Sequence, residues 1–75
     1  MVKKFSQLYL DARRALLEKE DVQMAGMMAR SVLNSVSGKT QEQLLASQNL
    51  YASEEVCEGV EQAVQRLRSN TPQKR

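Results

Sequence analysis

Apolar residues recur every three or four positions through most of the chain, which is the spacing of amphipathic α-helices. No segment combines apolar–polar alternation with β-branched residues, so we expect no sheet. Breaks in the periodicity divide the chain into four expected helices, at about residues 3–19, 22–36, 40–46 and 53–69. The pattern therefore predicts an all-α fold: one compact bundle of four to five short helices within residues 1–70.

The first two expected helices supply most of the expected core. The stripe of the first consists of Phe5, Leu8, Tyr9, Ala12, Ala15 and Leu16, widened by Leu10 and Leu17. The stripe of the second consists of Val22, Ala25, Ala29, Val32, Leu33 and Val36, with Met24, Met27 and Met28 beside it. Because the second helix is apolar around much of its circumference, we expect it to be central. Gly26 inside it costs about 1 kcal/mol relative to Ala, which a close approach to another helix would justify.

The last two expected helices are separated by a polar connection. In the third helix we expect Leu44 and Leu45 to face inward, and in the connection we expect Leu50 and Tyr51 to cover one end of the core. Ser53 is the expected N-cap of the fourth helix. The stripe of that helix consists of Val56, Val60, Ala63, Val64 and Leu67.

The triplet Gly38-Lys39-Thr40 raises the question of a phosphate-binding loop. Such a loop needs a second glycine five positions earlier, where this chain has Leu33, and no strand precedes the triplet. The end of one helix followed by the start of the next explains the same three residues. Gly38 provides the left-handed residue that ends one helix, and Thr40 with Gln43 forms a capping box for the next.

Composition narrows the functional classes. The chain has 75 residues, of which 41% are hydrophobic and 27% charged, as in a soluble globular domain. Its net charge of +2 comes from scattered basic residues, so we expect no nucleic-acid partner. No apolar run is long enough to span a membrane, and the N-terminus does not have the apolar segment of a signal peptide. Together with a single cysteine, these features predict a cytoplasmic protein.

No group of residues forms a pattern typical of catalysis. Without histidine there is no evident base to activate a serine, and Cys57 alone is insufficient for a zinc site. We therefore expect no catalytic, metal-binding or cofactor-binding residue on this chain. The best candidates for partner contact are Met27, which points away from the stripe of its helix, and Gln48, Asn49 and Tyr51 in the connection.

About the last two-thirds of the chain resembles the N-terminal helical domain of peptide-chain release factor glutamine methyltransferases. The similar segment is the run MAGMMARSVLNSVSGKTQEQLLASQNLYASEEVCEGVEQAVQRLRSNTP. The matching letters are Ala29, Val32, Leu33, Gly38, Lys39, Glu42, Leu44, Leu45, Ser53, Glu54, Glu55, Arg66, Arg68 and Pro72. Two extra residues precede Gly38, and Thr71 stands where the family has glycine. Domains of this family usually have five helices, which a bend near Arg13 and Arg14 would give here.

The resemblance implies a role without chemistry of its own. The parent enzyme would transfer a methyl group from S-adenosylmethionine to the glutamine of the Gly-Gly-Gln motif in release factors. In that family the cofactor and the catalytic loop belong to a C-terminal domain, so no catalytic residue carries over. The helical domain would hold the release factor and pack against its own C-terminal methyltransferase domain. Residues 71–75, around the stop at Pro72, are expected to be a frayed tail or the start of a linker.

Two other functions remain open from the sequence. One is a free-standing small helical interaction module or a homodimeric adaptor, although we expect a monomer. The other is a helix-turn-helix DNA-binding protein, which the acidic start of the fourth helix disfavours.

Overall fold

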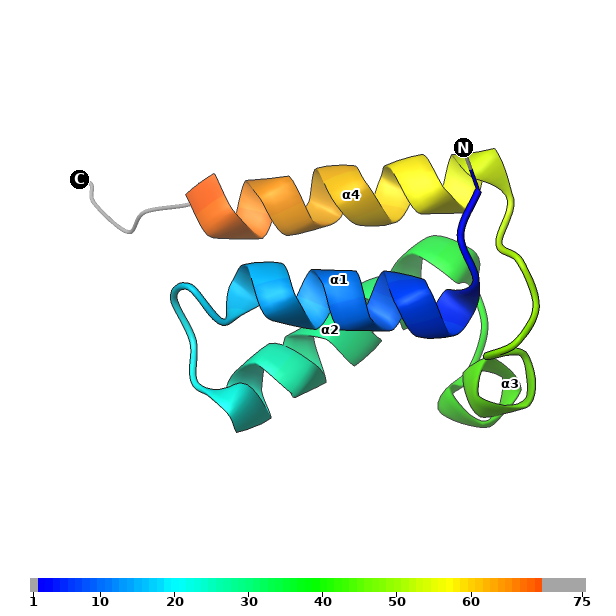
Figure 1. Cartoon of the computed structure of the whole chain (residues 1–75), viewed down its shortest axis with the longest axis horizontal. Helices are drawn as coiled ribbons and strands as arrows, with labels where there is room; N and C mark the ends of the chain where they lie inside the picture. The colour runs from blue at the N-terminus through cyan, green and yellow to red at the C-terminus, as the bar shows by residue number, and fades with distance from the viewer. Residues whose placement is uncertain (1, 70–75) are drawn as a thin grey trace.

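A computed structural model describes residues 2–69, which form four helices and no strand (Figure 1). The helices are α1 (Phe5–Leu16), α2 (Val22–Ser37), α3 (Gln41–Ala46) and α4 (Glu54–Ser69). The all-α prediction is confirmed. The expected stop at Pro72 and the tail at 71–75 lie outside the described residues.

Side-chain and backbone caps define the ends of the helices, and those at Gly38, Thr40 and Ser53 are the ones that the sequence predicts. The Asp21 carboxylate accepts a hydrogen bond from the Met24 amide at 2.8 Å, and Ser53 Oγ accepts from the Val56 amide at 3.2 Å. Gly38 ends α2 in the left-handed conformation, with φ 73°. Thr40 and Gln43 form the expected capping box, so the Gly38–Thr40 segment separates two helices.

The helix α1 is shorter than the predicted 3–19. It begins at Phe5 because the preceding residues are extended and pair with the connection between α3 and α4, through an isolated antiparallel bridge between Lys4 and Tyr51. The first amides of α1, which have no partner within the helix, donate to that connection: Phe5 N–H to Leu50 O at 3.1 Å and Ser6 N–H to Gln48 O at 3.0 Å. The helix is uninterrupted from Phe5 to Leu16, so no bend near residues 13 and 14 divides it into two helices.

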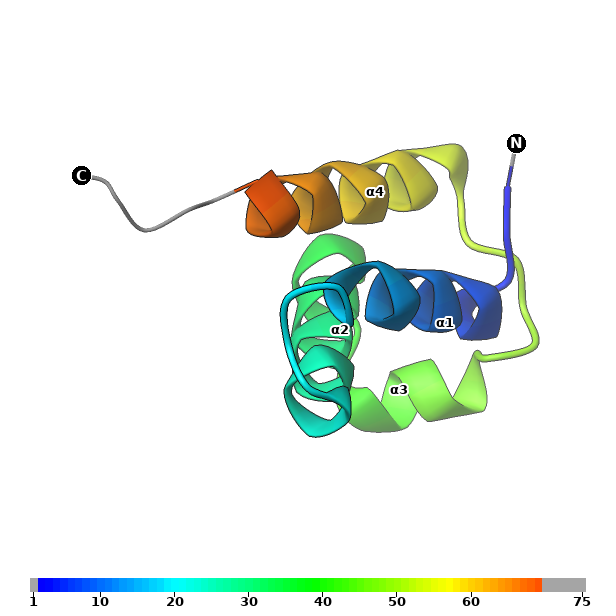
Figure 2. The same ribbon diagram turned by 60° about the vertical axis from the view of Figure 1, so that its left-hand side comes forward.

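The four helices pack with α2 in contact with all the others, which confirms its expected central position. The helix α1 also packs against α4. Both ribbon views place α4 and α3 on opposite sides of α1 (Figures 1 and 2), and α2 crosses behind α1 in Figure 1. One side of α1 is therefore turned toward α3, and the opposite side is turned toward α4.

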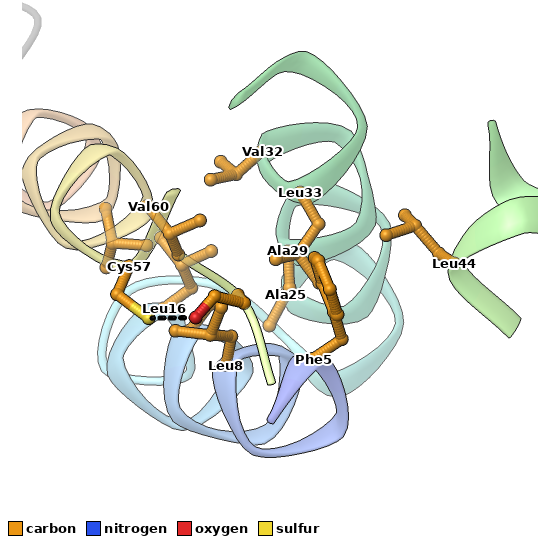
Figure 3. Close-up of a cluster of buried hydrophobic side chains, with 13 residues drawn as sticks. Phe5, Leu8, Leu16, Ala25, Ala29, Val32, Leu33, Leu44, Cys57 and Val60 are labelled. Carbon is orange, nitrogen blue, oxygen red and sulfur yellow. Dashed lines mark hydrogen bonds between the residues drawn. The ribbon is translucent and has the colours of Figure 1, made fainter. Parts of the chain in front are cut away.

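The core is built from small and medium aliphatic side chains (Figure 3). Its buried members are Phe5, Leu8, Ala12, Leu16, Ala25, Ala29, Val32, Leu33, Leu44, Ala52, Cys57, Val60 and Val64. Ala25 and Ala29 are fully inaccessible, so α2 approaches its neighbours through methyl groups. Such close approach is what a core almost without aromatic residues requires.

Six apolar residues that the sequence placed on the core-facing stripes or over the end of the core are exposed instead: Leu10, Leu17, Val22, Leu45, Leu50 and Tyr51. Val22 is the first residue of α2 and is 64% exposed. In the connection, the backbone pairing with Lys3 and Lys4 turns Leu50 and Tyr51 outward, and Ala52 is buried in their place.

The short helix α3 buries only one of its two leucines. It packs mainly against α2, so a single side of it is covered. Leu44 occupies that side and is 8% exposed, whereas Leu45 is 60% exposed. Consecutive residues point about 100° apart around a helix, and one contact cannot cover both.

Candidate functional site

A groove runs between α1 and α3, with α2 as its floor. Its volume is about 400 Å³, and we call it the α1–α3 groove. The residues that line it are Phe5, Ser6, Tyr9, Leu10, Arg30, Leu33, Gln41, Leu44, Leu45 and Gln48. Six of these ten have apolar or aromatic side chains, and none is acidic.

Exposed leucines stand on both walls of this groove. Leu10 of α1 is 40% exposed and Leu45 of α3 is 60% exposed, while Phe5 and Leu44 are buried beneath them. The buried pair belongs to the core and fixes the two walls relative to α2. The exposed pair makes no comparable contribution to the core, so it is available to another molecule.

Three basic side chains are held beside the groove by aromatic rings. The guanidinium carbons of Arg13 and Arg30 both lie 5.8 Å from the centroid of the Tyr9 ring. Lys39 Nζ lies 5.8 Å from the centroid of the Phe5 ring. A cation at this distance from a ring gains about 0.5–1 kcal/mol at an exposed site. The groove is therefore apolar inside and positively charged at its edge.

Gly26 makes room for the ring that carries two of these cations. A Cβ atom built on Gly26 would lie 3.1 Å from Tyr9 Oη, which is tighter than nine in ten real contacts of Cβ atoms. A close approach to another helix would justify this glycine, and what lies against it is the end of the Tyr9 side chain of α1. Tyr9 can consequently lie across α2 between Arg13 and Arg30.

The candidate contact residues chosen from the sequence are divided between two surfaces. Gln48 lines the groove, and Asn49 and Tyr51 are exposed on the connection next to it. Met27 is 55% exposed on the outer side of α2 and does not line the groove. All four are thus accessible, but only the three residues of the connection lie near the groove.

Leu10, Leu45 and Arg30 are groove residues that the sequence reasoning did not select. Leu10 appeared only as a widening of the α1 stripe, and Leu45 was expected inside. The one available signal was the run of apolar residues on α1, which is wider than one packed face needs. No pattern in the sequence indicates where α3 packs, although its position creates the groove.

A second groove, of about 410 Å³, separates α1 from α4. Its charged side chains are of both signs and partly paired: Lys3 Nζ lies 2.8 Å from Asp11 Oδ2, and Arg68 lies 2.6 Å from Glu18. The hydrogen bond from Lys3 lowers the pKa of Asp11 and raises the pKa of Lys3 itself. With Glu58 and Glu61 also lining this groove, its charges do not favour one class of ligand.

Within residues 2–69, no group of three or more His, Cys, Asp or Glu side chains is arranged to hold a metal ion. Cys57 is buried in the core, where it packs as a small apolar residue. None of the four helices described combines the length and the apolar character needed to cross a membrane.

Comparisons of the chain with protein-family models, with curated proteins and with solved structures found no match.

Proposed function

We propose that this chain is the non-catalytic recognition domain of a release-factor glutamine methyltransferase. The observation that carries the proposal is the resemblance of its last two-thirds to the N-terminal helical domain of those enzymes. The structural roles of the matching residues support it: Gly38 ends a helix, Leu44 is core, and Ser53 caps α4. A shared pattern of ends and core positions is what a shared helical domain would require.

The proposed role is binding and positioning. The methyl donor, S-adenosylmethionine, would be held by a separate catalytic domain, which would also be a packing partner of this bundle. The substrate would be a release factor in the cytoplasm, and the bundle would contribute binding energy away from the reacting glutamine. Binding energy from remote contacts supports catalysis by orienting the substrate.

The α1–α3 groove is the surface best suited to the release factor. Leu45 and Leu10 offer apolar contact, and Gln48 and the neighbouring Asn49 offer hydrogen bonds at one end. Interfaces of this kind have an apolar centre and a polar rim. Met27, on the outer side of α2, is the alternative contact and is tested separately.

A direct binding measurement tests the proposal. Purified chain is titrated with a recombinant bacterial release factor by isothermal titration calorimetry, alongside Leu45→Glu and Met27→Glu variants. We expect saturable binding that Leu45→Glu weakens, because a carboxylate would enter an apolar contact. No binding up to about 100 µM, which corresponds to the range of weak specific complexes, would contradict the proposal. Equal affinities of Met27→Glu and the unchanged chain would remove Met27 from the interface.

The second candidate function is an interaction module that acts without any methyltransferase domain. The exposure of Leu45, Leu50 and Tyr51, each at 60% or more, favours it, because apolar side chains at a surface often mark a protein contact. Sedimentation velocity over a range of concentrations distinguishes its homodimeric form from a monomeric domain.

A further inference from the structure

We propose that the α1–α3 groove binds an amphipathic helix of another protein, one whose apolar anchor residues are flanked by acidic side chains. The inference rests on the proposed role in protein recognition, but not on the partner being a release factor. The groove would select a partner by the apolar anchors and the acidic flanking residues of its helix.

The shape and the apolar lining fit a helix. The α1 residues that line the groove lie between Phe5 and Leu10, and the opposite wall, α3, has six residues and spans about 9 Å, enough for about two turns of a second helix. Leu10 and Leu45 face this space from opposite walls, and both are exposed. A docked helix with anchors spaced i, i+3, i+4 and i+7 would cover both leucines along one face.

The charge of the rim selects the flanking residues. Arg13, Arg30 and Lys39 are each stacked on a groove aromatic, and the lining contains no carboxylate. Stacking restricts these long side chains before a partner arrives, so less conformational entropy is lost on binding. Carboxylates beside the anchors of a bound helix would meet cations already in position, and lysines there would be repelled.

A second copy of this chain fits the groove poorly. Its own acidic helix is α4, which begins with Glu54 and Glu55 and continues with Glu58 and Glu61. The apolar face of α4 is already buried in the core, where Val60 and Val64 are 3% and 6% exposed. A copy of the bundle would have to unpack α4 before it could offer the acidic amphipathic helix that the groove selects.

Two synthetic peptides provide the test. Both are blocked at their ends and carry leucines at i, i+3, i+4 and i+7; one has glutamates flanking the leucines and the other has lysines at the same positions. Amide shifts of the ¹⁵N-labelled chain follow each titration. We expect the glutamate peptide to bind at least about tenfold more tightly and to shift residues on α1 and α3, with the preference shrinking in high salt. Equal affinities or a preference for the lysine peptide would overturn the proposal.

Single substitutions in the chain show which residues bind the glutamate peptide. Leu45→Glu should weaken binding of the glutamate peptide about tenfold or more, because the site loses an apolar contact and gains a repulsion. Its side chain is mostly exposed, so the bundle should still fold, which circular dichroism checks. Arg30→Gln should lower the affinity severalfold, whereas Arg66→Gln, the same change at an exposed position of α4, should leave it unchanged. Equal losses from the two arginine variants would mean a general charge effect and would overturn the proposal.

The remaining outcomes separate this inference from the proposed function. Binding of a release factor without discrimination between the peptides would overturn the inference and leave the proposed function standing. Discrimination between the peptides without binding of a release factor would support the inference and contradict the methyltransferase assignment. A concentration-dependent dimer that Leu45→Glu dissociates would identify a second copy as the occupant and overturn the inference.

Discussion

Gly59 of α4 lies directly against Val36 of α2, so closely that a Cβ atom built on Gly59 would be 2.6 Å from Val36 Cγ1. Real Cβ atoms essentially never approach another heavy atom so closely, and the valine is branched at Cβ and stiff. The contact between α2 and α4 at this point therefore depends on the missing side chain.

Gly59→Ala should destabilise the bundle although Ala is the better helix former. Overpacking costs about 1–3 kcal/mol and exceeds the gain of about 1 kcal/mol in helix propensity. Urea unfolding gives the change in free energy. A double-mutant cycle with Val36→Ala should show a coupling of about 1 kcal/mol or more, because the smaller side chain makes room for the methyl group. Additive effects would mean that the two residues do not clash.

Gly26→Ala is the matched control on α2. Its built Cβ would approach only the hydroxyl at the far end of the Tyr9 side chain, at 3.1 Å, and that end can shift by a few tenths of an ångström. We expect Gly26→Ala to be neutral or stabilising by up to about 1 kcal/mol, the helix propensity gain. A loss as large as that of Gly59→Ala would show that the position of Tyr9 is rigidly fixed.

The helix interiors and most of their ends were predictable from the sequence because they depend on local chemistry. Apolar spacing located α2 and α4 to within one residue at each end. Asp21, Gly38, Thr40 and Ser53 act on backbone groups only a few positions away, so their roles follow from residue type. Such interactions are the ones that single-sequence patterns contain.

The errors arose where a distant segment decides the outcome. The start of α1 was wrong because its first amides donate to Gln48 and Leu50, far along the chain. The same pairing exposes Tyr51, which the sequence placed in the core. The α1–α3 groove was missed for a related reason: Leu45 is a groove residue only because α3 packs against α2 on a single side. Periodicity records that a side chain is apolar, and not which neighbour covers it.

Thr40→Ala should destabilise α3 and with it one wall of the groove. Thr40 Oγ1 accepts a hydrogen bond from the Gln43 amide at 3.2 Å, and Gln43 Oε1 accepts from the Thr40 amide at 2.9 Å. Loss of an N-cap of this kind costs about 1 kcal/mol. With six residues, α3 is too short to persist without such support.

Hydrogen exchange provides the measurement for this change. The amides of Leu44 and Leu45 should exchange about five times faster or more in Thr40→Ala, the factor that corresponds to 1 kcal/mol. Thr40→Ser keeps the hydroxyl and should exchange as the unchanged chain does. Loss of protection in α4 as well would mean that the substitution unfolds the whole bundle rather than α3.

The pair of Lys3 and Asp11 predicts a dependence of stability on pH. Asp11 accepts hydrogen bonds from Lys3 Nζ at 2.8 Å and Gln7 Nε2 at 2.9 Å, and the bond from Lys3 is the main cause that lowers the pKa of Asp11 below 3.8. Because the folded state holds the proton less tightly, the stabilisation is complete above pH 3.8 and is lost as the pH falls through the folded pKa. The raised pKa of Lys3 acts at the other limit: its contribution is complete below pH 10.5 and is lost as the pH rises through the folded pKa.

A double-mutant cycle of Lys3→Gln and Asp11→Asn measures this pair. Both side chains are about a third exposed or more, so solvent screens them and the coupling at pH 7 should be only about 0.2–1 kcal/mol. It should shrink in high salt and disappear well below pH 3.8. A coupling that persists in acid would mean that packing, rather than charge, links the two residues.

Cys57 should react slowly with thiol reagents in the folded chain. The Cys57 side chain is 9% exposed, and its sulfur accepts a hydrogen bond from the Lys3 amide at 3.4 Å. Its thiol donates to Ala52 O at 4.0 Å (Figure 3). These contacts tie the start of the chain to the first turn of α4, so a reagent reaches the sulfur only when they open. We expect the reaction with an aromatic disulfide to be at least about 100-fold slower than in denaturant, which corresponds to an opening free energy of about 3 kcal/mol.

An exposed thiol on the same helix is the control for this measurement. Gln62→Cys, introduced together with Cys57→Ala, places the thiol on the solvent side of α4 and should react about as fast folded as unfolded. Asp11→Asn, which removes the negative charge paired with the Lys3 side chain, should speed the reaction of Cys57 if opening begins at the N-terminal segment. An unchanged rate in that variant would place the opening in α4 itself, and a fast reaction in the unmodified chain would contradict the burial of the sulfur.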